Sequence, residues 1–339
     1  MKFFTKKIIF ASLAAAFVAT GCSDKSPQLV PASTVNKETV SEKPQDLVMF
    51  NPKVDILFVI DNSGSMQDAQ TNLSRNARLF SDAITKMSVL DYHIGVTSTD
   101  MNDCQRGCGN LIGFPYFVDK NTANGASALA NNMLIGTDGS SIEMMFSPVV
   151  NALTTSLNNP SNVGFYRADA YLAIILITDA EEQSRLSPAD LLNFLIQKKG
   201  DASKVLAYGV IRKLAEERTC YDMGETLSDK LETFLSTVVN ADKKQNNVLS
   251  LCASDYGIKL AQFAADIVKR SSGTIRLQRI PNVKTIKVTY GVQVIPNDPK
   301  TGWVFEVSTN SIILSADIKF IDQGPNVGLS VDFDVIETK

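Results

Sequence analysis

An Asp-x-Ser-x-Ser pattern is the feature of this sequence most suited to chemistry. It consists of Asp61, Ser63 and Ser65, and Gly64 between the serines lets the backbone bend tightly. The carboxylate and the two hydroxyls can therefore converge on one point. Hard cations such as Mg2+ take oxygen ligands and usually keep some water, so the pattern predicts a site for Mg2+, with Mn2+ or Ca2+ as alternatives. A loop that only caps the following helix would use the same residue types.

Two apolar runs lead directly into acidic residues. Residues 54–60 contain six apolar residues in seven, four of them β-branched, which predicts a strand buried on both faces and followed at once by Asp61. Residues 171–178 form a second such run, which ends at Asp179. Open α/β sheets bind ligands at the carboxyl ends of their parallel strands. Asp61 and Asp179 are therefore predicted to lie at the same edge of one sheet.

Strands alternate with helices up to residue 272. Further strands are predicted at residues 92–99, 204–211 and 248–251. Amphipathic helices are predicted at residues 69–87, 226–239 and 256–270, and another between the cap sequence at 187–190 and Gly200. This alternation predicts a doubly wound, mostly parallel sheet flanked by helices, a Rossmann-like α/β fold.

Two parts of this region are less regular. Residues 100–132 are rich in Asn, Gly and Ala and are predicted to form an elaborated loop beside the cation edge, where loops commonly carry specificity. Residues 133–157 run from a glycine-rich loop into a helix. Ser140 or Ser141 would cap this helix ahead of Glu143.

Short alternating strands replace the helices after residue 272. Leu329, Val331 and Phe333, for example, alternate with polar residues, and turn sequences separate such segments. The pattern predicts a small antiparallel β-sandwich over residues 273–339. The formal net charge of −3 argues against a nucleic-acid-binding surface anywhere in the chain.

The N-terminus reads as a processing segment. Lysines precede an apolar run, and Ala19-Thr20-Gly21-Cys22 follows as a small-residue cleavage site. Residues 1–21 thus resemble a bacterial lipoprotein signal peptide, which implies lipid attachment at Cys22, with an ordinary secretory signal as the alternative. Residues 22–50 are rich in Ser, Pro, Lys and Glu and are predicted to be a flexible tether. The resemblance implies a bacterial envelope protein held by its lipid anchor, and Ser23 implies the outer membrane.

Residues 51–272 resemble the von Willebrand factor A domain and its metal-ion-dependent adhesion site. The intact Asp-x-Ser-x-Ser pattern after the first strand is the most specific feature of this resemblance. Within that superfamily the chain is most similar to bacterial envelope lipoproteins with one such domain. The shared motifs are G-T-x-G-S-x-x-E at residues 136–143, T-D-x-E-E at 178–182, S-x-C-x-x-D at 250–255 and a G-W…N-S-I hairpin at 302–312.

The resemblance implies a set of metal ligands. Ser63 and Ser65 would bind the metal directly, and Asp61 and Asp179 directly or through water. Thr137 would be the ligand from the second loop, although Ser140 and the threonines near 97–99 compete for this role. Water or an Asp or Glu from a partner would complete the shell. Glu181 and Glu182 are expected to support the site or to face solvent, without binding the metal.

The five cysteines divide into Cys22 for the lipid and four others. An even number in an oxidising compartment favours disulfides. Of the three possible pairings we favour Cys104 with Cys108, which can close only a small loop, and Cys220 with Cys252. A structural zinc site is the alternative, but unequal spacing and one histidine in the whole chain suit it poorly.

The sequence offers little for an enzyme. His93, the only histidine, is predicted at the start of a strand, opposite the Asp61 edge, which favours a structural role. The chain lacks a G-x-S-x-G elbow, a phosphate-binding P-loop and a G-x-G-x-x-G fingerprint. A phosphatase using Asp61 would normally want a second carboxylate where Ser63 stands.

We therefore expect a non-enzymatic binding module of the envelope. Its metal would seat a carboxylate from a protein or extracellular-matrix partner, whose identity the sequence does not indicate. A structural subunit of an envelope assembly, with a silent or only stabilising metal site, is the alternative. An open cavity at Ser63, Ser65 and Asp179 would favour binding, and a plugged one would favour the structural subunit.

Overall fold

The computed structural model describes residues 45–85, 88–154, 159–213, 229–241, 244, 246–315, 317–321, 323 and 327–336. The predicted signal peptide, Cys22, Cys220 and most of the predicted tether lie outside these residues. None of the described helices is long and apolar enough to cross a membrane.

A six-stranded, mostly parallel sheet forms the centre of the α/β region. Its strand order is β4-β3-β2-β5-β6-β7, and only β4, at one edge, runs antiparallel to its neighbour. The strands are β2 (Lys53–Ile60), β3 (Asp91–Ser98), β4 (Phe117–Asp119), β5 (Tyr171–Ile177), β6 (Val205–Ile211) and β7 (Val248–Ser250). The doubly wound α/β fold expected from the alternating pattern is confirmed.

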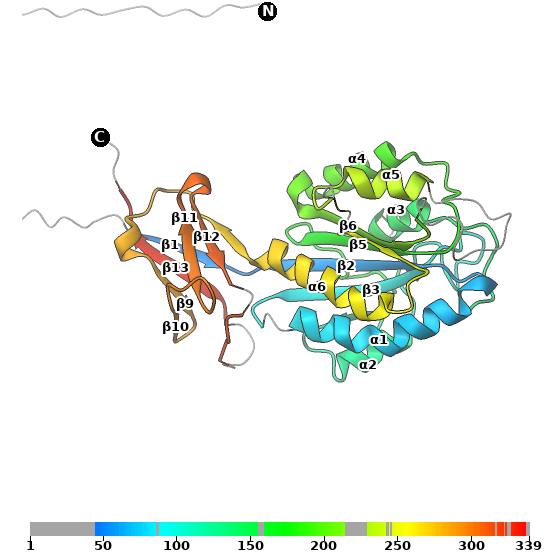
Figure 1. Cartoon of the computed structure of the whole chain (residues 1–339), viewed down its shortest axis with the longest axis horizontal. Coiled ribbons are helices and arrows are strands. Elements are labelled where there is room, and N and C mark those ends of the chain that lie inside the picture. Colours follow the sequence, from blue (N-terminus) through cyan, green and yellow to red (C-terminus); the bar gives the residue numbers. More distant parts are fainter. Residues whose placement is uncertain are drawn as a thin grey trace, which may run out of the picture. The chain divides into compact units, whose positions relative to one another are not determined.

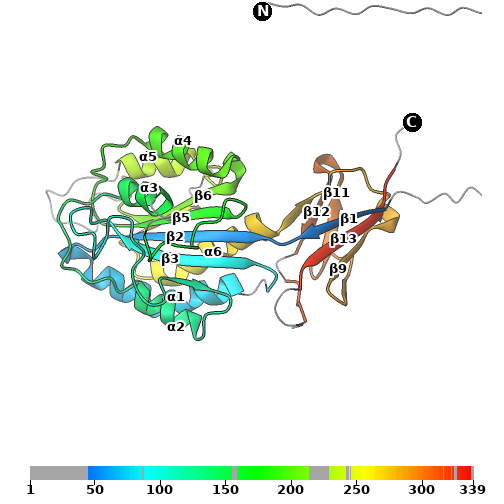
Figure 2. The same cartoon turned by 180° about the vertical axis from the view of Figure 1, so that it is seen from behind.

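Helices cover both faces of this sheet (Figures 1 and 2). One face carries α1 (Gln67–Thr85), α2 (Gly125–Asn132) and α6 (Tyr256–Ser272). The other carries α3 (Phe146–Thr154), α4 (Pro188–Lys199) and α5 (Asp229–Thr237). Alternate residues of β2 enter the two apolar clusters: Phe58 packs on the α1 side and Val59 on the α3 side. Burial on both faces explains why the strand is an almost continuous apolar run.

Helix α4 begins and ends as its sequence predicts. Ser187 and Asp190 form a reciprocal capping box, with Pro188 in the first turn. Gly200 follows the last turn with φ of +67°, a left-handed conformation that glycine adopts without steric penalty.

The predicted start of α3 is wrong. The helix begins at Phe146, and neither Ser140 nor Ser141 caps it. Its first amide groups instead donate to a distant carboxylate, because Glu182 Oε2 accepts hydrogen bonds from the backbone of Met145 and Phe146. A cap from another segment of the chain leaves no local sequence signal.

Residues 100–132 are more ordered than the predicted single loop. The tripeptide Phe117–Asp119 pairs as β4 with the free edge of β3, from His93 to Gly95. Helix α2 follows and buries Leu129 in the cluster that also contains α1. A three-residue strand and an eight-residue helix rich in Ala and Asn are too short to give a clear periodic pattern.

The C-terminal module contains two antiparallel sheets. Their strand orders are β1-β13-β9-β10 and β11-β12-β8. The strands are β1 (Gln45–Phe50), β8 (Thr274–Arg276), β9 (Lys287–Tyr290), β10 (Gln293–Ile295), β11 (Trp303–Glu306), β12 (Ser311–Leu314) and β13 (Leu329–Asp334). One apolar cluster contains residues of both sheets, among them Val331 and Ile312. This packing is that of a small sandwich.

Strand β1 corrects the predicted extent of the tether. Residues 45–50, expected to be flexible, pair antiparallel with β13 from Gln45 opposite Asp334 to Phe50 opposite Leu329. The module is therefore built from both ends of the described chain. The partner strand lies almost three hundred residues further on, so local composition carried no trace of the pairing.

Candidate cation site

Asp61 is held rigidly at the carboxyl end of β2. Its backbone N–H donates to Ile177 O in the neighbouring strand β5 at 2.9 Å. Its carboxylate accepts hydrogen bonds from Ser63 N at 2.8 Å and from Thr178 Oγ1 at 2.6 Å. The side chain is fully buried. Two buried strands thus fix this acid in place before any ligand is considered.

The two serines of the pattern follow Asp61 in the sequence, and their hydroxyl groups face each other. Their hydroxyl oxygens are 3.0 Å apart. Ser63 is half-buried and Ser65 is exposed, in a short 3-10 turn that buries Met66 and leads into α1. The turn therefore presents two neighbouring hydroxyls at the surface of the sheet edge.

The loop that contains Thr137 is fastened onto this turn. Gln70 Nε2 bridges the two segments, because it donates to Asp61 O and to Gly136 O, each at 2.8 Å. Gly139 N donates to Asn62 O at 2.9 Å. A Cβ at position 139 would lie 2.3 Å from the Asn62 side chain, so any larger residue here would have to displace Asn62.

Thr137 and its competitors occupy different surroundings. Thr137 Oγ1 donates to Gln67 Oε1, at the start of α1, at 3.3 Å. The Ser140 hydroxyl instead accepts from Asn102 Nδ2 at 3.0 Å. Thr99 is buried, and its hydroxyl donates to Glu143 and lies 3.3 Å from Asn62 Oδ1, within the pattern. Thr137 is thus the one of these three whose hydroxyl bonds to the segment following Ser65, and its role as a ligand stays a prediction.

Asp179 lies beside Asp61, as the two strand ends require. It follows Thr178, which donates to the Asp61 carboxylate. One Asp179 oxygen lies 3.6 Å from the Arg212 guanidinium, just after β6, and both side chains are largely buried. Ser65, Asp179 and Arg212 line a common pocket of about 420 Å3 between the start of α1 and the start of α6. The edge predicted to hold the cation therefore opens to solvent.

Glu143 is a third carboxylate at this edge, and the sequence interpretation missed it. Only 3% of the residue is exposed, and Thr99 Oγ1 donates to its Oε2. Its Oε1 has no hydrogen-bond partner among the residues that the structure describes. Burial, and then the negative charge of Asp61, raise the pKa of Glu143 to about 8. Its position in the sequence had suggested only a helix-capping acid.

The acidic residues that follow Asp179 serve neighbouring helices. Glu182 is buried and caps α3, and its other oxygen accepts from Ser184 N at 2.7 Å. Glu181 accepts from Asp229 N at the start of α5 at 3.1 Å. Neither carboxylate is directed by these bonds toward the serines.

His93 lies away from this edge. It pairs with Asp55 in the first half of β2, and its Nδ1 is 2.8 Å from Phe165 O. The ring also stacks against Phe117 at 4.6 Å between centroids. These contacts are those of a structural residue.

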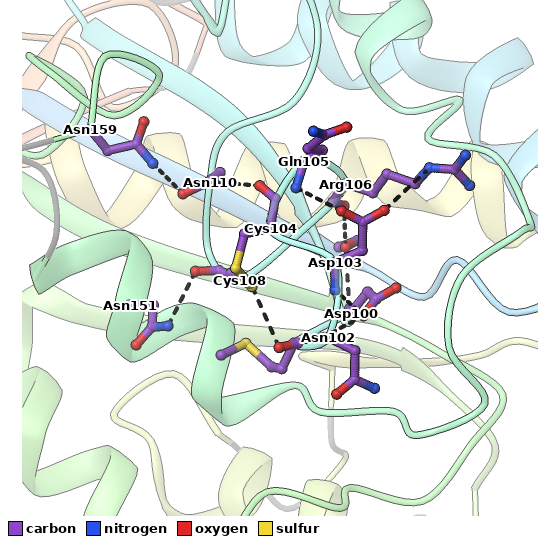
Figure 3. The surroundings of a disulfide bond; sticks show 12 residues. Asp100, Asn102, Asp103, Cys104, Gln105, Arg106, Cys108, Asn110, Asn151 and Asn159 are labelled. Carbon is purple, nitrogen blue, oxygen red and sulfur yellow. Dashed lines mark hydrogen bonds and ion pairs between the residues drawn. A yellow bond between two sulfur atoms is a disulfide. The ribbon is translucent and has the colours of Figure 1, made fainter.

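A disulfide closes the loop after β3 (Figure 3). Cys104 and Cys108 are bonded to each other, as predicted. Asn110 Nδ2 donates to Cys104 O at 2.6 Å, and Asn151 of α3 donates to Cys108 O at 3.2 Å. Cys252 is also disulfide-bonded, and its predicted partner, Cys220, lies outside the described residues.

Oxygen donors make up the candidate site. Within the described part of the chain, no three His, Cys, Asp or Glu side chains are arranged to hold a metal ion by themselves. The predicted site would not give such a group, because three of its five ligands are hydroxyls. An oxygen-only set suits Mg2+, Mn2+ or Ca2+. The unpaired, buried Glu143 oxygen also indicates that a cation would fit here.

Comparisons with known proteins give distant structural similarity only. No protein-family profile matches the sequence, and no curated protein matches it. Proximal thread matrix protein 1 from the mussel byssus is 13% identical, with a TM-score of 0.37, over 66% of this chain and 48% of that one. A form of it with zinc in its MIDAS motif is 14% identical, with a TM-score of 0.37, over the same shares of the two chains.

A pilus adhesin, SpaC from Lactobacillus rhamnosus GG, is also similar in structure. It is 13% identical, with a TM-score of 0.40, over 85% of this chain and 40% of the adhesin. The chain thus spans less than half the length of each of these proteins.

Proposed function

We propose that this chain is a non-enzymatic binding module of the bacterial envelope, held by a lipid on Cys22. It binds a divalent cation, Mg2+ or else Mn2+ or Ca2+, at a metal-ion-dependent adhesion site of the von Willebrand factor A type. The ligands are Asp61, Ser63, Ser65, Thr137 and Asp179. The cation then accepts a carboxylate from a protein or extracellular-matrix partner.

One observation carries this proposal. Two acids from strands far apart in the sequence lie at one sheet edge, with paired serine hydroxyls beside them and an open pocket that contains Ser65 and Asp179. The arrangement supports binding over the alternative of an assembly subunit with a silent site, because in that case we expect a neighbouring element to fill the pocket.

The chemistry of the donors explains how such a site would bind a carboxylate. A bound divalent cation supplies positive charge that neutral hydroxyl ligands leave largely uncompensated. Ser63 and Ser65 lie on the solvent side of the site, so a partner's carboxylate would approach over them. The buried Asp61 would hold the cation from the opposite side. Hydrogen bonds from Ser63 N and Thr178 Oγ1 hold that carboxylate still.

The test is capture of a partner from envelope extract, first with Mg2+ and then with EDTA. We expect a partner to be retained with Mg2+ and released by EDTA, and Asp61→Ala to reduce retention to the EDTA level while the circular dichroism spectrum stays unchanged. Asp82→Ala, which removes an exposed carboxylate of α1, should bind like the unchanged chain. Binding that survives both EDTA and Asp61→Ala would refute a metal-mediated contact.

Lipid attachment needs a separate test. The chain should incorporate radiolabelled palmitate when expressed in a bacterium, and Cys22→Ser should abolish the label. A chain that stays unlabelled and is recovered without membranes would contradict the proposed anchor.

A further inference from the structure

We propose that Glu143 is a further side chain of this cation site. Together with Asp61 it holds the cation from the buried side, and its own contact with the cation is made through one water. The inference rests on the proposed function and adds a residue to it. The predicted ligand set did not include Glu143.

The backbone around Glu143 is anchored to two of the strand ends that form the site. Met144 N donates to Thr99 O, just after β3, and Gln183 N donates to Glu143 O at 2.9 Å. Residue 143 is thereby placed beneath the edge where β2 and β5 end. The Thr99 hydroxyl that donates to Glu143 Oε2 also lies 3.3 Å from Asn62 Oδ1, so the Glu143 carboxyl group lies close to the residue that follows Asp61.

Glu182 shows how this protein satisfies a buried carboxylate when no cation is needed. Both residues are at most 3% exposed. Glu182 accepts hydrogen bonds from the backbone of Met145, Phe146 and Ser184. Glu143 accepts from the Thr99 hydroxyl on one oxygen, and its other oxygen accepts no hydrogen bond from any residue that the structure describes. A buried polar oxygen normally has a hydrogen-bond partner, so Glu143 lacks what Glu182 has.

A divalent cation between Glu143 and Asp61 supplies this partner. Two carboxylates that lie close together in a buried position repel each other when both are ionised. A cation reverses the sign of the interaction for both groups. The two carboxylates would form the buried floor of the site, and the hydroxyls of Ser63 and Ser65 its solvent-facing rim. The open position for a partner would stay on the rim.

The test is calorimetric titration of MnCl2 into the full-length chain. We expect Glu143→Gln, which keeps the shape and removes the charge, to raise the Mn2+ dissociation constant at least tenfold. The metal-free variant should melt at about the same temperature as the unchanged chain, because the Gln side chain keeps the shape and can still accept the hydrogen bond from Thr99. A purely structural role predicts the reverse: a lower melting temperature and an unchanged Mn2+ affinity.

Glu181→Gln is the matched control. It removes the same charge near the same edge, but its carboxylate bonds to the start of α5, so Mn2+ affinity should change less than twofold. If both variants weaken Mn2+ equally, general electrostatics explain the effect and the assignment to Glu143 falls.

The same experiments distinguish a wrong role for Glu143 from a wrong proposal of the cation site. One result would overturn only the inference about Glu143: Mn2+ binds the unchanged chain, does not bind Asp61→Ala, and binds Glu143→Gln with unchanged affinity. A chain that binds no Mn2+ overturns both. If Glu143→Gln does not fold, anomalous scattering from Mn2+ in crystals of the unchanged chain decides. An ion within about 4.5 Å of a Glu143 oxygen, the reach of one bridging water, supports the inference, and a greater distance overturns it.

Discussion

A cluster of buried charged residues near the start of β2 is paired within the protein. Asp55 is fully buried in β2, and Arg167 binds it through Nε at 2.8 Å and through its backbone N–H at 2.6 Å. Lys199, at the end of α4, donates to Arg167 O at 2.7 Å and lies over the Tyr166 ring. This cluster satisfies its charges within the protein, in contrast to Glu143.

Lys199 gives a prediction of pH dependence. Burial is the main cause that lowers its pKa from 10.5 to about 8, against the attraction of Asp55. Between these two values the unfolded chain holds a proton that the folded chain has released. The free energy of unfolding therefore gains a contribution that rises with pH across this range.

Lys199→Met removes that contribution. We expect the stability of the unchanged chain relative to this variant to grow by on the order of 2 kcal/mol between pH 8 and pH 10.5, after allowance for solvent screening. Urea denaturation of both proteins at several pH values measures the difference. A difference that stays constant with pH would show that Lys199 keeps its proton on folding.

The loop between β3 and β4 shows how one element is docked on another. Asp100 organises its start by accepting from the backbone of Asn102 and Asp103, and the disulfide closes the next turn. Gly109 then packs against α3 with φ of +81°, and a Cβ there would lie 2.6 Å from Ala152 N and from Pro148 O. Both obstructing atoms are backbone, so they cannot move aside easily.

Gly109→Ala should therefore destabilise the protein strongly. A left-handed alanine costs about 1 kcal/mol, and the steric overlap adds about 1–3 kcal/mol. Gly200→Ala is the control, because that glycine also has positive φ but nothing within 4 Å of its Cβ position, so only the first cost applies. Urea midpoints measure both. Equal losses for the two variants would mean that the loop does not pack closely on α3.

The first and last strands of the described residues pair with each other. β1 precedes the α/β region and β13 follows it, and their six residue pairs place β1 at the edge of a four-stranded sheet. Trp303, the only tryptophan, is buried in β11 of the same module, and its Nε1 donates to Ile295 O at 3.0 Å. Its fluorescence therefore reports on the module alone.

Removal of residues 1–50 should destabilise the C-terminal module. β13 would lose its outer partner and expose an unpaired edge, which favours aggregation. A chain that lacks only residues 1–44 keeps β1 and serves as the control. We expect the Trp303 transition in urea to shift to lower concentration only in the shorter chain. Identical transitions would show that β1 contributes nothing to the module.

The sequence by itself determined the α/β alternation, the ends of α4, and the placement of Asp61 and Asp179 at one edge. Each depends on local chemistry: a continuous apolar run marks a strand buried on both faces, and a capping box marks a helix start. The parallel arrangement then follows from the alternation of strands with helices. Asp61 and Asp179 could be paired because each directly follows such a run.

Only the tertiary structure decided which distant groups meet. The unpaired oxygen of Glu143, the capping of α3 by Glu182 and the joining of β1 to β13 all depend on segments separated by 36 residues or more in the chain. No local pattern encodes such contacts, because the side chains involved are ordinary for a cap, a loop or a linker. They become distinctive only when the sheet brings three strand ends together and removes water from the groups between them.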